Sequence, residues 1–87
     1  MRKHYSTILK TFFYRNLIQT RLAQNMTQEQ MAEALIMDVR SYINLDHGKS
    51  SCSALTLSLY LIYYCSDVDS FLQELKEAFE NATNEIA

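Results

Sequence analysis

The scarcity of glycine and proline is the feature that most constrains what this chain can fold into. Its 87 residues include no proline and one glycine, Gly48. These two residues supply most of the turns that separate short strands, and no stretch alternates apolar and polar residues for long enough to form a half-buried strand. The sequence therefore predicts an all-α fold without linkers, in one domain that spans residues 1–87.

Apolar residues at helical spacing predict two helices in the first half of the chain. The first runs from about Ser6 to Gln24, and Asn25 is suited to a left-handed stop. Thr27 can cap the second helix while Gln30 reaches back, which is the spacing of a capping box. Three residues of the second helix are expected to face the core, and these are Met31, Ala32 and Leu35.

Three further helices are predicted after residue 38. Asp38 is a good cap for a third helix over residues 39–47, and Gly48 supplies the positive φ that ends it. Ser53 caps a fourth helix that reaches residue 64, and a fifth starts between residues 67 and 70, within a C-terminal segment of about 67–87. The apolar stripe of the fifth helix consists of Val68, Phe71, Leu72, Leu75, Phe79, Ala82 and Ile86.

Composition excludes several classes of protein. The chain is 48% hydrophobic and 21% charged, which is too apolar for a disordered protein. No apolar run approaches the roughly 18 residues that span a bilayer, and no secretory signal follows the basic N-terminus. Cys52 and Cys65 are too few for a disulfide framework. We therefore expect two reduced thiols in a cytoplasmic protein.

Charge is distributed unevenly between the two halves. Residues 1–49 carry seven Lys and Arg against four Asp and Glu, a balance of +3, whereas residues 50–87 carry one against six, a balance of −5. If one half meets a polyanion, it is the first. The balance of +3 is equally compatible with an ordinary solvated face.

Several features within residues 21–49 form a specific combination, which consists of Arg21, Thr27-Gln28-Glu29-Gln30, Met31-Ala32, Leu35, Arg40-Ser41-Tyr42 and Leu45-Asp46-His47-Gly48-Lys49. This combination resembles the helix-turn-helix of the phage-repressor-like (XRE-type) family. The resemblance covers about residues 15–72, with the motif at about 27–47, and it implies a five-helix domain that binds double-stranded DNA as a homodimer. Such a protein would regulate transcription without a cofactor.

The resemblance also implies which residues meet DNA. The third helix would lie in the major groove, where Arg40 can form two hydrogen bonds to guanine and Val39 can pack on a thymine methyl. The residues expected to contact bases are Val39, Arg40, Ser41 and Asn44. Phosphate contacts are expected from Gln28 and Lys49. Arg21 and Asp46 are expected to form an architectural pair, strained or water-bridged because aspartate is one methylene shorter than the usual glutamate.

Two residues depart from the family pattern. Ile36 stands where the turn often has a glycine with positive φ, and a β-branched residue there costs roughly 1–2 kcal/mol. Either the turn is wound differently, or packing of Ile36 and Met37 offsets the cost. Asp38 lies close to the expected DNA surface, where it can cap the third helix, accept from a cytosine amino group or repel phosphates.

Catalysis finds little support in the sequence. His4 and His47 lie far apart, and adjacent Asp46 and His47 at a helix end point in different directions although Cys52 follows nearby. No spacing of ligands indicates a metal site, and no glycine-rich loop indicates phosphate binding. We therefore expect no enzyme activity, no metal and no cofactor.

The alternative function is a protein-interaction module on the same scaffold, with weak or no DNA binding. Tyr60 and Tyr63 are candidates for a surface that binds a protein partner, because tyrosine combines an apolar ring with a polar end. Equally, these rings can lie over the first or fifth helix while Leu57, Leu61 and Tyr64 form the core. The stripe of the fifth helix, together with the aromatic first helix, can instead seal a homodimer.

Overall fold

The computed structural model describes the backbone of residues 2–86 and the side chains of residues 4–82. These residues form five α-helices and no strand, which confirms the all-α prediction. The helices are α1 (Arg2–Ala23), α2 (Gln28–Ala34), α3 (Val39–Asp46), α4 (Ala54–Tyr63) and α5 (Val68–Ile86). The first helix starts well before the predicted Ser6, and the other bounds agree with the predictions to within a residue or two.

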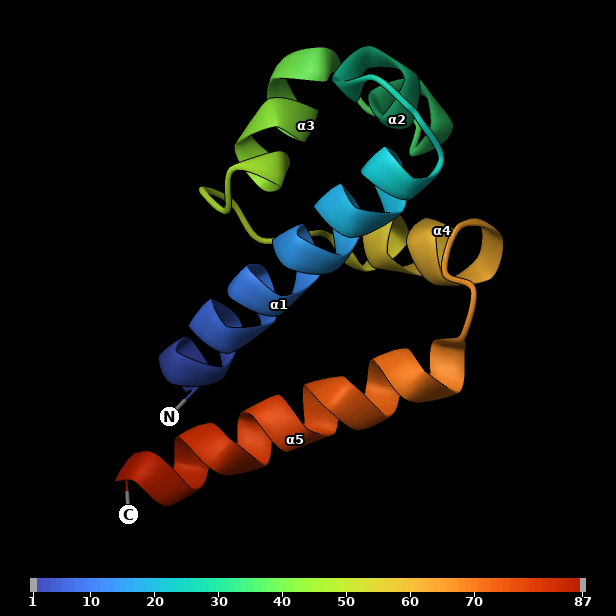
Figure 1. Ribbon diagram of the computed structural model, residues 1–87. Helices are drawn as coiled ribbons and strands as arrows, with labels where there is room; N and C mark the ends of the chain where they lie inside the picture. The colour runs from blue at the N-terminus through green and yellow to red at the C-terminus, as the bar shows by residue number, and fades with distance from the viewer. Residues whose placement is uncertain (1, 87) are drawn as a thin grey trace.

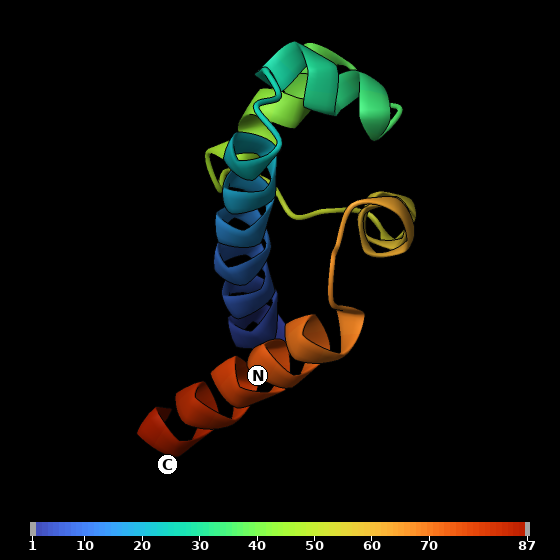
Figure 2. The same ribbon diagram turned by 45° about the vertical axis from the view of Figure 1, so that its right-hand side comes forward.

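The long helix α1 organises the other four (Figure 1). Helices α2 and α3 lie together at its C-terminal end, and α5 runs back so that both ends of the chain lie at the same end of the molecule (Figures 1 and 2). Rings of α1 and α5 meet edge to face, since Tyr5 lies 5.1 Å from Phe79 and Phe12 lies 5.1 Å from Phe71 between ring centroids. No helix in the described part of the chain is long and apolar enough to span a bilayer.

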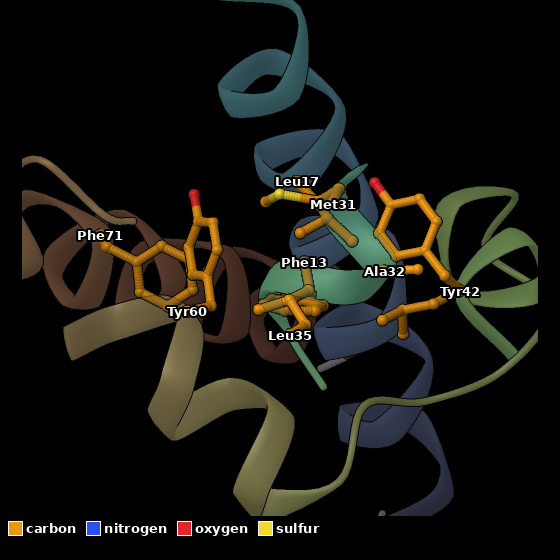
Figure 3. Close-up of a cluster of buried hydrophobic side chains, with 9 residues drawn as sticks. Phe13, Leu17, Met31, Ala32, Leu35, Tyr42, Tyr60 and Phe71 are labelled. Atoms are coloured by element: carbon orange, nitrogen blue, oxygen red, sulfur yellow. The ribbon is translucent and has the colours of Figure 1, made fainter. Parts of the chain in front are cut away.

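One core receives side chains from all five helical segments (Figure 3). Phe13 lies edge to face with Tyr60 at 5.3 Å between ring centroids, and Tyr60 lies 5.9 Å from Phe71. The predicted inner face of α2 is confirmed, because its members are at most 1% exposed. The buried apolar residues are Phe13, Leu17, Met31, Ala32, Leu35, Tyr42, Leu45, Tyr60 and Phe71.

Helix α4 does not bury the face of Leu57, Leu61 and Tyr64 that one sequence interpretation assigned to the core. The same interpretation is confirmed for Tyr60, whose ring lies against α1 and α5. Thr56 and Tyr60 are its buried residues, at 8% and 2% exposure, whereas Leu57, Leu61 and Tyr64 are only half-buried. The Tyr60 hydroxyl lies 2.8 Å from the Thr20 hydroxyl of α1. The prediction that Tyr60 belongs to a partner-binding surface is therefore wrong for the folded chain, because its side chain is buried. The buried face of α4 could not be predicted correctly from the sequence, because the helix is apolar all round and its periodicity does not indicate which side is buried.

The apolar stripe predicted for α5 is largely confirmed, and it packs within the chain. Phe71 is buried, while Val68, Leu75, Phe79 and Ala82 are half-buried. Leu72 is the exception at 49% exposure, and the side chain of Ile86 lies outside the described ones. Since α1 already covers much of this stripe, little of it is left over to seal a homodimer.

Candidate nucleic-acid interface

Helices α1, α2 and α3 each end in the same type of backbone turn. After α1, the Met26 amide donates to the Arg21 carbonyl (2.9 Å) and the Asn25 amide to the Leu22 carbonyl (3.1 Å). This is the Schellman pattern, which needs a left-handed residue at its centre. The same pair of hydrogen bonds recurs after α2 and α3. The central residues are Asn25 (φ 55°), Ile36 (φ 56°) and Gly48 (φ 70°).

Ile36 therefore adopts the left-handed conformation that the sequence pattern associates with glycine. The Met37 amide donates to the Ala32 carbonyl (3.0 Å) and the Ile36 amide to the Glu33 carbonyl (3.1 Å). The prediction that this turn is wound differently is thus wrong. The other prediction is that packing of Ile36 and Met37 offsets the strain. It holds for Met37, which packs against the core, but not for Ile36, which is 77% exposed. The strain at Ile36 is offset by the rest of the turn, not by its own side chain.

Asp38 caps α3, which settles its structural role. Its carboxylate accepts from the Ser41 amide at 2.8 Å, and Asp38 itself has extended backbone geometry. Hydrogen bonding from the Ser41 side chain and then from its backbone amide lowers the pKa of Asp38, and the Arg40 charge lowers it further. Asp38 is consequently ionised near neutral pH, exposed, and placed at the start of α3.

The outward side of α3 carries the residues that the sequence assigned to base contacts. Arg40, Ser41 and Asn44 are exposed, while Val39 lies at the edge with 37% exposure. The opposite side is buried through Tyr42, Leu45 and Asp46. We call the exposed residues Arg40, Ser41, Asn44 and His47 the α3 outer face. His47 was missed as a member, although its spacing of three from Asn44 and seven from Arg40 is the signal of a shared helix face.

A buried carboxylate holds α3 against α1 and α2. Asp46 is 3% exposed and accepts from the Tyr42 hydroxyl at 2.8 Å and the Gln28 side-chain amide at 3.1 Å. The Arg21 guanidinium approaches it at 3.5 Å, and also donates to the Met26 carbonyl at 3.3 Å. The ion pair is direct but long, in keeping with the short aspartate side chain. Two neighbouring helices, α1 and α2, thus fix the orientation of α3 through one residue.

Two partners of Asp46 have properties that follow from this position. Burial, and then the hydrogen bond to Asp46, raises the pKa of the Tyr42 phenol far above its usual range, so that it stays a donor. Gln28 is half-buried, and its amide already serves Asp46. A phosphate contact by Gln28 would have to use its second amide hydrogen. The sequence missed both contacts, although the spacing of four between Tyr42 and Asp46 places them on one side of a helix.

A hollow of about 310 Å³ with a mixed polar and apolar lining separates the α3 outer face from the start of α4. Ser41 and Asn44 line it from α3, and Ser50, Ser51 and Ser53 line it from the connecting loop. Lys49 is exposed at the beginning of this loop. These serines were not predicted as site residues, although their run beside Lys49 is a concentration of small hydrogen-bonding groups of the kind that contacts phosphate.

The residues weighed for catalysis do not form an activated pair. Burial raises the pKa of the Cys52 thiol, whereas a nucleophilic cysteine needs a lowered one. His47 is exposed at the end of α3. Within residues whose side chains are described, no three His, Cys, Asp or Glu gather closely enough to hold a metal ion.

Comparison of the chain with models of protein families, with curated proteins and with solved structures found no match.

Proposed function

We propose that this chain is a sequence-specific DNA-binding transcriptional regulator of the phage-repressor-like helix-turn-helix type, acting as a dimer. The observation that carries the proposal is the two-sided character of α3. Its inner side is fixed by the buried Asp46 and Tyr42, and its outer face presents an arginine, an asparagine and a serine to solvent. A rigid helix with polar outward side chains is what reading of major-groove base edges requires.

Each residue of the interface has a role in this proposal. Arg40 forms two hydrogen bonds to guanine, Asn44 and Ser41 contact neighbouring bases, and Val39 packs on a thymine methyl at the edge. Lys49 neutralises phosphate, supported by the adjacent loop serines, and Gln28 adds a contact through its free amide hydrogen. Asp38 stays with its cap and opposes the phosphates nearby.

The charge of this surface sets the expected salt dependence. Arg40 and Lys49 are the cations of α3 and its following turn, with Asp38 against them. Each neutralised phosphate contributes about −0.9 to the slope of log affinity against log salt concentration. We therefore expect a shallow slope of about −1 to −2 per copy, and specificity that depends mainly on direct contacts to bases.

The test is a titration of random and selected duplexes at two salt concentrations. Arg40→Ala is expected to weaken binding to the selected duplex by about tenfold or more, since a bidentate guanine contact contributes about 1–3 kcal/mol. The matched control is Arg15→Ala, which removes an exposed arginine from the groove between α1 and α5. Equal effects of the two variants, or no binding to any duplex at low salt, would refute DNA reading by α3.

One observation favours the alternative, a protein-interaction module with weak or no DNA binding. Helix α4 leaves Leu55, Ile62 and Tyr63 at 66%, 69% and 70% exposure. In that case the chain would keep a protein partner after Arg40→Ala and lose it after Tyr63→Ser. The two functions therefore separate on which variant abolishes which interaction.

A further inference from the structure

We propose that two copies of this chain meet through the outer side of α4. This inference deepens the proposed function, because it rests on the dimer expected there and assigns its interface. Helix α4 lies at the edge of the molecule, with no other described element outside it (Figure 2). Leu55, Ser58, Leu59 and Ile62 follow one another at helical spacing, and we call them the α4 outer face. Tyr63 lies beside Leu59 at its rim.

The α4 outer face is far more apolar than a solvated helix surface. Leu55 and Ile62 are 66% and 69% exposed, whereas Leu59 at the edge of this face is half-buried because part of it packs against the core. Together with Tyr63 they expose roughly 400 Å² of mostly apolar surface, the size of patch that marks interaction sites on small proteins. Helices that are apolar all round are normally enclosed on every side. The fold encloses α4 on its inner side through Thr56 and Tyr60.

The one polar side chain within this face can be buried at low cost. The Ser58 hydroxyl donates to the Ala54 carbonyl of its own helix at 2.7 Å. Removing water from Ser58 therefore leaves no unsatisfied donor, which would otherwise cost about 1–3 kcal/mol. Ser58 is also small, so a second helix can approach closely at this point.

The order of residues on α4 suits a second copy of the same chain. Leu55 and Ile62 lie equally far, in opposite directions, from the midpoint between Ser58 and Leu59. A two-fold axis through that midpoint sets Leu55 of one copy opposite Ile62 of the other, twice in each dimer. Such mutual pairing is what a closed two-fold interface requires.

Charge also selects α4 over α5 as the contact between copies. Residues 54–63 include no charged side chain, so two copies of α4 meet without repulsion. The exposed side of α5 carries Asp69, Glu74, Glu77 and Glu80, with only Lys76 against them, 3.8 Å from Glu80. Stable complexes bury about 800 Å² per partner. The α4 outer face supplies about half of that area, so the dimer forms reversibly and depends on protein concentration.

The test is sedimentation equilibrium of the full chain without DNA, over a wide range of concentration. We expect reversible dimers for the wild-type chain and a dimer dissociation constant raised at least about tenfold by Ile62→Glu, because each dimer would enclose two carboxylates. Leu72→Glu is the matched control, since Leu72 is a 49% exposed apolar residue on α5. Leu72→Glu should change the dimer dissociation constant by less than about twofold, because substitutions at exposed positions outside an interface are near neutral.

A double variant tests the two-fold arrangement itself. Leu55→Lys combined with Ile62→Glu should dimerise more tightly than Ile62→Glu alone, because the axis sets each new ammonium opposite a new carboxylate of the other copy. Circular dichroism checks that every variant remains helical. A wild-type monomer at all concentrations, equal effects of Ile62→Glu and Leu72→Glu, or no gain in the double variant would each overturn the inference.

The outcome is separable from that of the proposed function. Arg40→Ala should dimerise like the wild-type chain because Arg40 lies on α3. A chain that dimerises through α4 but binds no duplex would refute the proposed function and leave the interface standing. A chain that binds its duplex as a monomer would overturn the α4 interface and the dimeric part of the proposed function, and would leave DNA reading by α3 standing.

Discussion

Replacing Ile36 with asparagine should stabilise the protein. Ile36 has a φ of 56° and its side chain is 77% exposed. A left-handed backbone costs an ordinary L-residue roughly 1–2 kcal/mol, whereas asparagine adopts it readily. About a quarter of the Ile36 side chain is buried, and complete burial of an isoleucine contributes about 1.5–3 kcal/mol, so the exchange loses about 0.5 kcal/mol of hydrophobic stabilisation. The free energy of unfolding should therefore rise by about 1 kcal/mol.

The reciprocal exchange is the matched control. Asn25 has nearly the same φ, 55°, at the centre of the same type of turn, and its side chain is also exposed. Asn25→Ile should lower the free energy of unfolding by about 1 kcal/mol, for the same reason with the opposite sign. Ile36→Val retains the β-branch and the strain, so it should change stability by less than about 0.5 kcal/mol.

Thermal unfolding followed by far-ultraviolet circular dichroism measures these differences. For a domain of this size, 1 kcal/mol shifts the melting temperature by about 4–8 °C. Ile36→Asn should melt higher than the wild-type chain by that amount, and Asn25→Ile lower. If Ile36→Asn and Ile36→Val gave the same melting temperature, or if Ile36→Asn melted lower, the reasoning from backbone strain would be refuted.

Three further predictions concern the contacts that hold α3. Tyr42→Phe should cost about 1–2 kcal/mol at neutral pH by leaving Asp46 without its shortest hydrogen bond. Because the pKa of Tyr42 is raised in the folded state, its contribution to stability is fully present below about pH 10 and is lost at higher pH. In urea unfolding, the free energy of unfolding of the wild-type chain should therefore fall more above that pH than that of Tyr42→Phe. Asp46→Ala should cost about 3–5 kcal/mol in chemical unfolding, since it strands the largely buried Arg21 charge; a loss below 1 kcal/mol would contradict this role. Gly48→Ala should lower the melting temperature by more than Asn25→Ile does, because its new methyl group would meet the Tyr14 ring at 2.9 Å in addition to the left-handed strain; an unchanged melting temperature would show that the ring moves aside freely.

The sequence by itself determined the helices and their ends. The caps at Thr27, Asp38 and Ser53, and the stops at Asn25 and Gly48, are all where local patterns predicted them. These features depend on hydrogen bonds between residues at most a few positions apart, so a short stretch of sequence contains all the partners. The outward side of α3 followed in the same way, because the amphipathic pattern of that helix distinguishes its two sides.

Tertiary structure alone decided which side of α4 is buried, and how Asp46 gathers its partners. All sides of α4 are apolar, so its orientation depends on how the α1 and α5 rings pack around Tyr60. Gln28 lies 18 positions from Asp46, and no local pattern reports a contact over that separation. The strain at Ile36 also belongs to this class, because a β-branched residue keeps a positive φ only where the surrounding packing leaves the chain no other path.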